Sequence, residues 1–222
     1  MLFTLLFELN SLPFEYKLVI FLTYVVAVIL ALTIHECAHG FMAYKLGDPT
    51  AKVAGRITLN PMAHFDPIGL ICFLILGFGW AKPVPVNPFN FKKIKRDSFL
   101  VSIAGVASNL VLAFIFCPLS MLLIPVAGNS VLLYALYCLC AYIYQVNLVL
   151  LVFNLLPIYP LDGFNAIASQ LKYTNKFVTF MQKYGSFILI GMIILFNYTN
   201  LFEYLVYYVG YPIDKLWSLI IY

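Results

Sequence analysis

The sequence predicts an all-α polytopic membrane protein with four full transmembrane helices, folded as one domain over residues 1–222. Of the 222 residues, 64% are hydrophobic and only 10% are charged, whereas a soluble domain carries about 25% charged residues. Four apolar runs are long enough to cross a bilayer core of about 30 Å as helices. Between the first two runs, shorter segments predict a re-entrant or half-membrane element and a small β-hairpin region at the membrane surface.

The first transmembrane helix is expected from Leu18 to about Leu46, where Gly47-Asp48-Pro49 stops it. The apolar residues 1–12 before it predict an interfacial helix, because no basic residues precede them as they would in a cleavable signal. Residues 18–171 form the expected core of the domain.

Two short elements are expected between the first and second transmembrane helices. Residues 50–61 alternate in a β-like pattern around Val53 and Ile57 and predict the hairpin. Residues 67–78 are apolar but only about a dozen long, too short to span the bilayer, so they predict the re-entrant element. The prolines within residues 80–88 then favour an extended path.

Three further transmembrane helices are expected at residues 99–124, 131–156 and 184–208. The second of the four carries small residues that allow close contact between helices. The tail that follows the last of them, to Tyr222, predicts a short interfacial helix.

The Lys and Arg residues indicate how these helices are oriented. Eight of the 13 lie between Lys45 and Arg96, and three more lie between residues 157 and 183. The positive-inside rule therefore places both regions in the cytoplasm. The basic residues form no patch interleaved with aromatic side chains, so nucleic-acid binding is not expected.

The segment His35-Glu36-Cys37-Ala38-His39 ends an otherwise uncharged apolar run. Residues four apart share a face of an α-helix, so His35 and His39 can hold one metal ion, and Glu36 can reach a water molecule bound to it. This HExxH pattern is typical of zinc hydrolases. The alternative, two histidines bonded to carbonyl groups of neighbouring helices, would be favoured for a lone histidine but is disfavoured for two histidines at this spacing with a glutamate between them.

A zinc enzyme needs a third protein ligand and an open position for water. The candidates on the cytoplasmic side are one histidine and four carboxylates: His64, Asp48, Asp66, Asp97 and Asp162. Asp162 stands out because two prolines precede it directly after the third transmembrane helix, where unwound backbone can line a polar cavity. From the residues alone, a metal ligand and the N-cap of a short helix to Leu171 are equally good readings of Asp162.

Several segments around these candidates form recognisable patterns: Gly47-Asp48-x-Thr50-Ala51, Gly55-Arg56-x-Thr58-Leu59-Asn60-Pro61, His64-x-Asp66-Pro67-x-Gly69, Gly79-Trp80-Ala81-Lys82-Pro83-Val84-Pro85-Val86 and Asn154-x-x-Pro157-x-x-Pro160-Leu161-Asp162-Gly163. With His35-Glu36-x-x-His39 they resemble the site-2 protease family of intramembrane zinc metalloproteases. The resemblance runs from Thr33 to about Leu171 and is strongest to the compact bacterial and archaeal branch, which lacks PDZ and other regulatory domains.

This resemblance implies that His35, His39 and Asp162 bind one zinc ion per chain. It also implies that Glu36 is the catalytic base, which takes a proton from the attacking water.

The same resemblance places three further residues near the site. Asn154, and Asn109 in Gly105-x-x-x-Asn109, match family positions that can hold the substrate backbone or the oxyanion. His64 is a possible accessory residue whose role stays open: it contacts the site, gates it or orients Asp66.

The implied function is intramembrane proteolysis, in which a zinc metalloendopeptidase hydrolyses peptide bonds within or near transmembrane segments of single-span or other membrane-protein substrates. The compact branch implies a multi-pass protein of the bacterial inner (plasma) membrane, surrounded by the lipid bilayer, with its active site toward the cytoplasm. The alternative is a catalytically inactive zinc-site membrane protein that acts as a binding or regulatory module. A metal transporter fits less well, because residues 19–32 offer only Thr23 and Tyr24 as polar groups.

Overall fold

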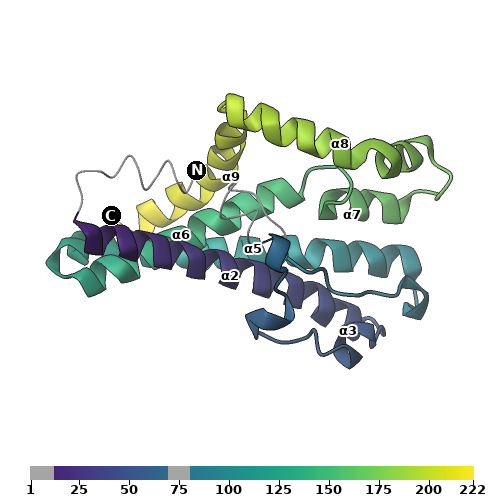
Figure 1. The fold of residues 1–222 in the computed structure, drawn as a ribbon, viewed down its shortest axis with the longest axis horizontal. Helices are drawn as coiled ribbons and strands as arrows, with labels where there is room; N and C mark the ends of the chain where they lie inside the picture. Colours follow the sequence, from purple (N-terminus) through teal and green to yellow (C-terminus); the bar gives the residue numbers. More distant parts are fainter. Residues whose placement is uncertain (1–12, 70–80) are drawn as a thin grey trace.

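The computed structural model describes residues 13–69 and 81–222, and every described element is helical. Three long helices form the centre: α2 (Phe14–Lys45), α5 (Ile94–Leu123) and α6 (Val131–Asn154). Each of the three packs against the other two, and they run side by side in Figure 1. The short helix α7 (Asp162–Gln170) packs on α5, and α9 (Leu201–Ile221) packs on both α5 and α6.

The helix α8 (Lys176–Tyr198) lies on the outside of this group. It contacts the connection between α6 and α7, where Leu189 packs with Ile158 and Leu161. Figure 1 shows α8 and α2 on opposite sides of the molecule, with α7 between α8 and α5. The remaining short elements are α3 (Thr50–Val53), η1 (Pro61–Ala63), η2 (Pro88–Asn90) and η3 (Ile124–Asn129).

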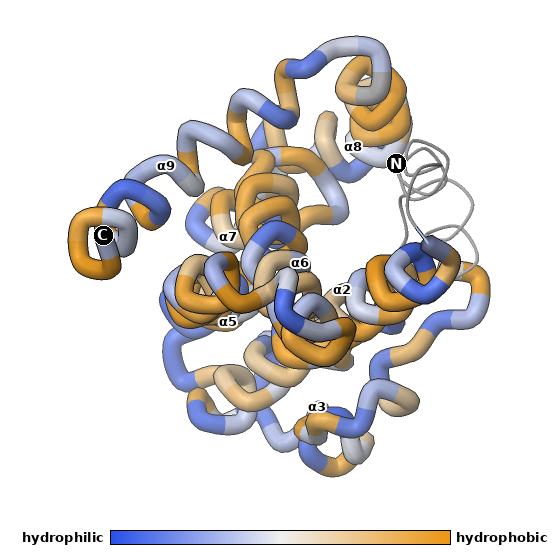
Figure 2. Tube along the Cα trace, turned by 90° about the vertical axis from the view of Figure 1, so that its left-hand side faces the viewer, coloured by the Kyte–Doolittle hydropathy of each residue, from blue (hydrophilic) through white to orange (hydrophobic). Residues whose placement is uncertain are grey.

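The described residues contain four helices long and apolar enough to cross a membrane: α2, α5 with η3, α6, and α8 as far as Phe196. This confirms the predicted number. Hydrophobic residues make up most of these helices in Figure 2. On α2 they also form an exposed stripe at four-residue spacing, which is the surface expected of a helix in contact with lipid tails (Leu18, Leu22, Val26, Leu30).

The first membrane helix ends, and the third begins, close to the residues that the sequence predicts. At the end of α2, Gly47 adopts φ +107°. The N–H groups of Gly47 and Asp48 then bond the carbonyls of Tyr44 and Ala43, which is the Schellman arrangement that a glycine permits. At the start of α6, the Ser130 hydroxyl accepts the Leu133 N–H at 3.2 Å and caps the helix.

The predicted start of the second membrane helix and the predicted extent of the fourth are wrong. Helix α5 begins at Ile94 instead of residue 99, because the buried Asp97 carboxylate accepts the Lys93 N–H and so stabilises a basic first turn that resembles a loop. The predicted helix 184–208 is in fact two helices. Thr199 is extended, and its hydroxyl bonds the Leu195 carbonyl, so α8 ends there and the tail forms the full helix α9.

The predicted β-hairpin is also wrong, since no strand occurs in residues 13–69 or 81–222. Residues 50–53 form the single helical turn α3, and Gly55 at φ +65° turns the chain away directly after it. Ile57 then packs near Gly40 of α2. Local packing of single side chains therefore overrides the alternating pattern. The predicted interfacial helix at 1–12 and most of the re-entrant element at 67–78 lie outside the described residues.

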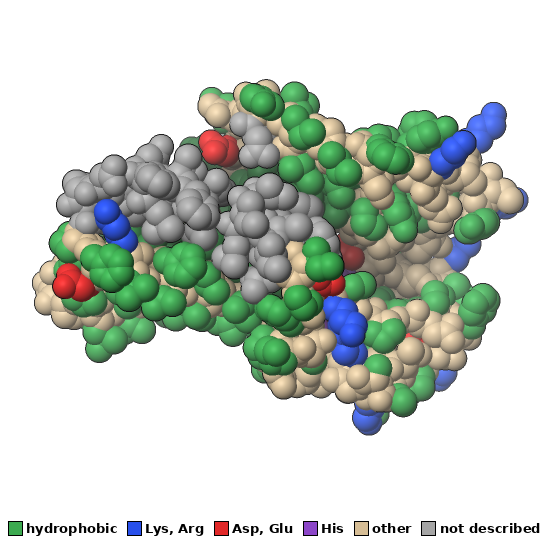
Figure 3. Space-filling view, in the orientation of Figure 1, with side chains coloured by type: hydrophobic (Ala, Val, Ile, Leu, Met, Phe, Trp, Pro, Cys, Tyr) green, Lys and Arg blue, Asp and Glu red, His purple; other side chains and the backbone are tan. Residues whose placement is uncertain are grey.

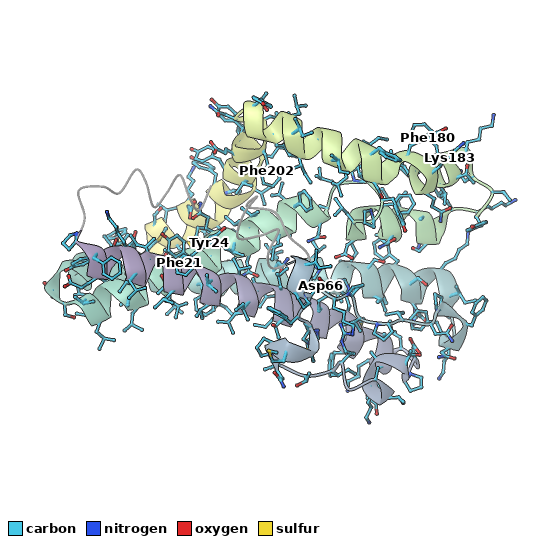
Figure 4. The ribbon with its side chains drawn as sticks, viewed as in Figure 1. Phe21, Tyr24, Asp66, Phe180, Lys183 and Phe202 are labelled. Atoms are coloured by element: carbon cyan, nitrogen blue, oxygen red, sulfur yellow. The ribbon has the colours of Figure 1, made fainter. Side chains whose placement is uncertain are left out.

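The connections that carry most of the chemistry lie at one end of the molecule. Helices α5 and α8 begin, and α2 and α7 end, in the half of the molecule away from the two termini (Figure 1). Most of the visible Lys and Arg side chains gather at the same end in Figure 3. Lys183, labelled in Figure 4, lies on α8 near its start, whereas the predicted helix begins only at residue 184. This clustering agrees with the single basic side that the sequence predicts.

Candidate metal centre

Helix α2 presents His35 and His39 one turn apart, close to its C-terminal end. The two imidazoles are almost fully enclosed, with 5% and 9% of each residue exposed. Their rings lie 4.7 Å apart in an edge-to-face arrangement, and the two Nε2 atoms are separated by 3.1 Å. The predicted pairing of these histidines on one face is therefore present.

Asp162 is brought to the histidines from 123 positions further along the chain. It is the first residue of α7, whose N-cap position is occupied by Leu161 without any side-chain capping bond. The Asp162 carboxylate faces His35 and His39 instead, so the capping alternative for Asp162 is wrong. A side chain at Gly163 would collide with the Leu155 carbonyl, which explains why a glycine follows Asp162 at this close approach of α7 to the end of α6.

Three metal-ligating atoms converge at this point. Asp162 Oδ2 lies 3.1 Å from His35 Nε2 and 3.1 Å from His39 Nε2, and the two nitrogens are also 3.1 Å apart. Ligand atoms in a tetrahedral zinc site lie about 2.0–2.1 Å from the ion and therefore about 3.3 Å from one another. The observed triangle fits zinc closely, and it is the metal-compatible cluster found among the described residues.

The charge on Asp162 suits this role. Burial on its own raises the pKa of a carboxyl group, but hydrogen bonds from His35 and His39 outweigh it and lower the pKa of Asp162 to about 2. The side chain is therefore an ionised carboxylate at neutral pH, which is the form that binds a metal ion.

Helix α5 closes the side of the site that faces the protein interior. Gly105 is in contact with both imidazoles: a Cβ atom there would lie 2.7 Å from His35 Nε2 and closer still to His39 Nε2. One turn earlier, the Val101 carbonyl accepts the His39 Nδ1–H at 2.7 Å. One turn later, the amide nitrogen of Asn109 lies 3.1 Å from His35 Nδ1.

The two predicted asparagines differ in their surroundings. Asn109 lies at the site as predicted, but it is fully buried and contacts His35, which leaves it no surface for the expected contact with substrate. Asn154 ends α6, and its amide donates to the Leu150 carbonyl of the same helix at 3.1 Å. A substrate or oxyanion role for Asn154 stays a prediction.

Glu36 is held by a backbone group from a distant segment of the chain. One oxygen of its carboxylate, Oε2, accepts the backbone N–H of Val84 at 3.0 Å. Val84 lies in the irregular segment 81–87, and hydrogen bonds to Arg56 and His64 hold this segment in place. The Arg56 guanidinium donates to the carbonyls of Lys82 and Pro83, and the His64 carbonyl accepts the Lys82 N–H at 2.9 Å.

His64 is not part of the metal cluster. Its side chain is 2% exposed, and Nε2 lies 3.0 Å from the Thr58 carbonyl. Together with the bond to Lys82, this contact joins the loop after α3 to the segment that reaches Glu36. These contacts, to Thr58 and Lys82, correspond to none of the three predicted roles, and the role of His64 stays a prediction.

Sequence reasoning missed the groups that support the ligands. The Val101 carbonyl and the Val84 N–H belong to the backbone, so no side chain marks them. From the sequence, Gly105 indicates only a close contact between helices, and Asn109 only a position that matches the family pattern. Their four-residue spacing with Val101 is a usable signal, because it predicts one face of α5, but the sequence does not say which helix that face contacts.

Three relatives of known name align with this chain. "Putative zinc metalloprotease YwhC" of Bacillus subtilis (strain 168) is 48% identical over 145 residues, which cover 64% of this chain and 66% of YwhC, just under two thirds of its length. "Putative zinc metalloprotease Rip2" of Mycolicibacterium smegmatis is 28% identical over 195 residues, with 85% and 73% covered. The Rip2 protein of Mycobacterium tuberculosis is 32% identical over 161 residues, with 69% and 59% covered. No protein-family model and no solved structure matches the chain.

Proposed function

The chain belongs to the site-2 protease-like family of the YwhC and Rip2 proteins, and from that premise we propose that it is an intramembrane zinc metalloprotease. The relatives carry names as zinc metalloproteases, which supports a metal-dependent peptidase. The cleavage of transmembrane segments is our own extension. It rests on the position of the metal cluster near the end of α2, a helix long and apolar enough to span a membrane.

One observation carries the proposal. His35 Nε2, His39 Nε2 and Asp162 Oδ2 form a triangle of 3.1 Å sides, and Glu36 is the neighbour of one ligand on the same helix. A purely structural zinc site has four protein ligands, whereas a catalytic site has three and keeps one position open. Three ligands beside a carboxylate therefore favour catalysis over the inactive binding module.

The residues divide the chemistry among them. When bound, zinc lowers the pKa of a coordinated water to about 7 and polarises a carbonyl oxygen. Glu36 takes a proton from the attacking water and passes it to the leaving amine. The Val84 N–H holds one oxygen of the Glu36 carboxylate at 3.0 Å and so fixes the direction of the other. Asn154 remains our candidate donor to the oxyanion.

The proposed substrate is a transmembrane helix of another protein. A peptide bond inside a helix is shielded by its own hydrogen bonds, so the substrate must unwind before Glu36 can act on it. The segment from Val84 to Val86 is our candidate for holding the unwound chain by strand addition. On the face shown in Figure 3, the surface is hollowed between the α8 side and the α2 side, with acidic side chains at its inner end. This hollow is a route by which a substrate segment can approach.

The orientation follows from the charges. The metal cluster lies near the C-terminal end of α2, and most of the visible Lys and Arg side chains gather in the same half of the molecule (Figure 3), so we assign this half to the cytoplasmic side of a bacterial inner membrane. Water then reaches the metal from the cytoplasm, near the turn that joins α6 to α7.

The test uses co-expression with tagged single-span membrane proteins. We expect the wild-type chain to release a shortened fragment and Glu36→Gln to release none, while both purified proteins contain one zinc per chain. Glu36→Gln retains the shape of the side chain but cannot accept the proton. Equal fragment release by both forms, at equal zinc content, overturns the protease. No fragment from either form with any substrate, at full zinc occupancy, favours the inactive binding module.

A further inference from the structure

Helix α5 offers the metal ligands three groups at four-residue spacing. The Val101 carbonyl lies 2.7 Å from His39 Nδ1, Gly105 leaves room for both rings, and the Asn109 side chain lies 3.1 Å from His35 Nδ1. The Val101 carbonyl and the Asn109 amide thus stand at equivalent positions behind the two histidines. Each touches the ring nitrogen that faces away from the metal.

A neutral histidine that binds a metal through Nε2 must carry its proton on Nδ1. That N–H group is buried here, so it needs an acceptor, and the acceptor in turn fixes the tautomer and the ring orientation. For His39 the condition is met, since a backbone carbonyl can only accept. His39 therefore presents a free lone pair at Nε2.

For His35 the condition depends on which end of the Asn109 amide faces the ring. The amide lies 3.1 Å from Nδ1. If its nitrogen faced the ring it could only donate, which would place the ring proton on Nε2, where a metal ion needs the lone pair.

A half-turn of the amide about its Cβ–Cγ bond exchanges the oxygen and the nitrogen. The oxygen would then accept the His35 Nδ1–H and leave Nε2 free for the metal. Asn109 Oδ1 is buried and has no hydrogen-bond partner among the described residues, so no bond to that oxygen opposes the turn.

We propose that Asn109 is a positioning residue for the metal centre. Its carbonyl oxygen accepts from His35 Nδ1–H, which fixes the orientation of the ring and leaves the Nε2 lone pair free for the metal. This inference rests on the proposed metal centre but not on peptide hydrolysis.

Asn147 shows what a buried asparagine without this role looks like. It lies on α6, is also fully buried, and also has an Oδ1 atom without a described partner. Its amide donates to the Ile143 carbonyl of its own helix at 2.7 Å. Asn147 therefore matches Asn109 in burial and chemistry but not in contact with a metal ligand, which makes it the control.

The first measurement is the zinc dissociation constant of the full chain in detergent micelles, by competition with a chelator. We expect Asn109→Leu to weaken binding about 10–100-fold, the usual cost of losing a partner behind a metal ligand. Asn109→Asp retains an acceptor and should restore binding to within about threefold of wild type. Asn147→Leu should leave the constant unchanged.

The second measurement follows the tautomers directly by NMR of 15N-histidine. The chain has 3 histidines, so three pairs of ring signals are expected, with His64 as an internal reference. We expect His35 to carry its proton on Nδ1 in the wild-type chain and in Asn109→Asp, which retains an acceptor. In Asn109→Leu, which offers no acceptor, the proton should shift toward Nε2 in the zinc-free chain.

The results separate this inference from the metal centre itself. A wild-type chain that binds no zinc overturns the metal centre and the inference with it. A wild-type chain that binds zinc overturns only the inference if Asn109→Leu binds as tightly as Asn147→Leu. A His35 proton on the same nitrogen in zinc-free wild type and zinc-free Asn109→Leu has the same consequence.

Discussion

Glu36 Oε2 and the backbone nitrogen of Val84 lie 3.0 Å apart, although 48 positions separate them in the chain. This bond attaches the segment 81–87 to the helix that carries both histidines. Because no other hydrogen bond to the Glu36 carboxylate is present among the described residues, its second oxygen is available for proton transfer. The segment therefore orients the proposed base without using a side chain.

Val84→Pro should slow cleavage about tenfold or more without changing the zinc content. Proline has no N–H group, so the bond to Glu36 is lost, and a hydrogen bond to a charged group is typically worth about 1.5–3 kcal/mol. Val86→Pro is the matched control, because this valine also follows a proline in the same segment. The measurement is kcat for a tagged substrate together with zinc per chain. Equal rates for the two variants would show that Val84 does not orient the base.

Gly105→Ala should abolish zinc binding. The new methyl group would occupy the space of the two imidazoles, and the backbone of a packed helix cannot move far enough to avoid it. Gly191→Ala in α8 is the control, since a Cβ there meets no atom within 4 Å. Metal analysis of both purified variants decides the matter. Stoichiometric zinc in Gly105→Ala would mean that the histidines do not hold the ion in this arrangement.

The helix boundaries that the sequence predicts well are those set by a single local residue. Ser130 caps α6 through its hydroxyl, and Gly47 ends α2 through its positive φ. Two other boundaries are predicted badly because they depend on hydrogen bonds made by single polar side chains. A hydropathy pattern does not show such bonds. Asp97 lets a basic segment become the first turn of α5, and Thr199 interrupts an apolar run that hydropathy treats as continuous.

The candidate site divides in the same way. His35, Glu36 and His39 can be predicted from spacing alone, because one helix turn brings the histidines together. Asp162 can be predicted as a ligand only with the help of the family resemblance. From the residue types and the local pattern alone, a metal ligand and a helix N-cap are equally good readings of this residue. The contacts of Val84 depend on how separate segments pack, and packing at that distance leaves no periodic signal in a sequence.

A buried polar contact also attaches the last helix, and Tyr144→Phe should loosen it. The Tyr144 hydroxyl on α6 donates to Asp214 on α9 at 2.6 Å, and Cys117 Sγ lies 3.4 Å from the same oxygen. Losing a buried hydrogen bond costs about 1–3 kcal/mol, which corresponds to roughly 5–150-fold more opening of α9. Cys117 is 1% exposed, so its rate of alkylation should rise by that factor.

Cys138 provides the internal control for this measurement. It is also buried but contacts Tyr134 instead of α9, so its alkylation should be unchanged. A parallel rise at both cysteines would indicate general unfolding, and no rise at Cys117 would show that Tyr144 does not hold α9 in place.

Asp48→Asn should destabilise the protein by about 2 kcal/mol at neutral pH, and the difference should disappear in acid. Burial raises the pKa of Asp48, but hydrogen bonds from Thr50, Asn90 and the Asn87 N–H outweigh it and lower the pKa below the ordinary value of 3.8. Both carboxylate oxygens accept bonds, at 2.7 Å from Asn87 N to Oδ2 and 2.7 Å from Asn90 Nδ2 to Oδ1. An amide in this position turns an NH2 group toward a donor, which costs about 1–3 kcal/mol.

The sign of the pH dependence follows from the lowered pKa of Asp48. A carboxyl group that is more acidic when folded stabilises the protein fully above its unfolded pKa, and that stabilisation is lost as the pH falls through the folded pKa. The stability gap between wild type and Asp48→Asn should therefore be constant from pH 7 down to about 4 and shrink below the ordinary pKa of 3.8. Thermal unfolding in micelles at several pH values measures it. Asp66→Asn is the control, because Asp66 caps an exposed turn through the N–H groups of Ile68 and Gly69. A gap that persists unchanged at pH 2, or an equal loss in Asp66→Asn, would show that the charge of Asp48 does not stabilise this connection.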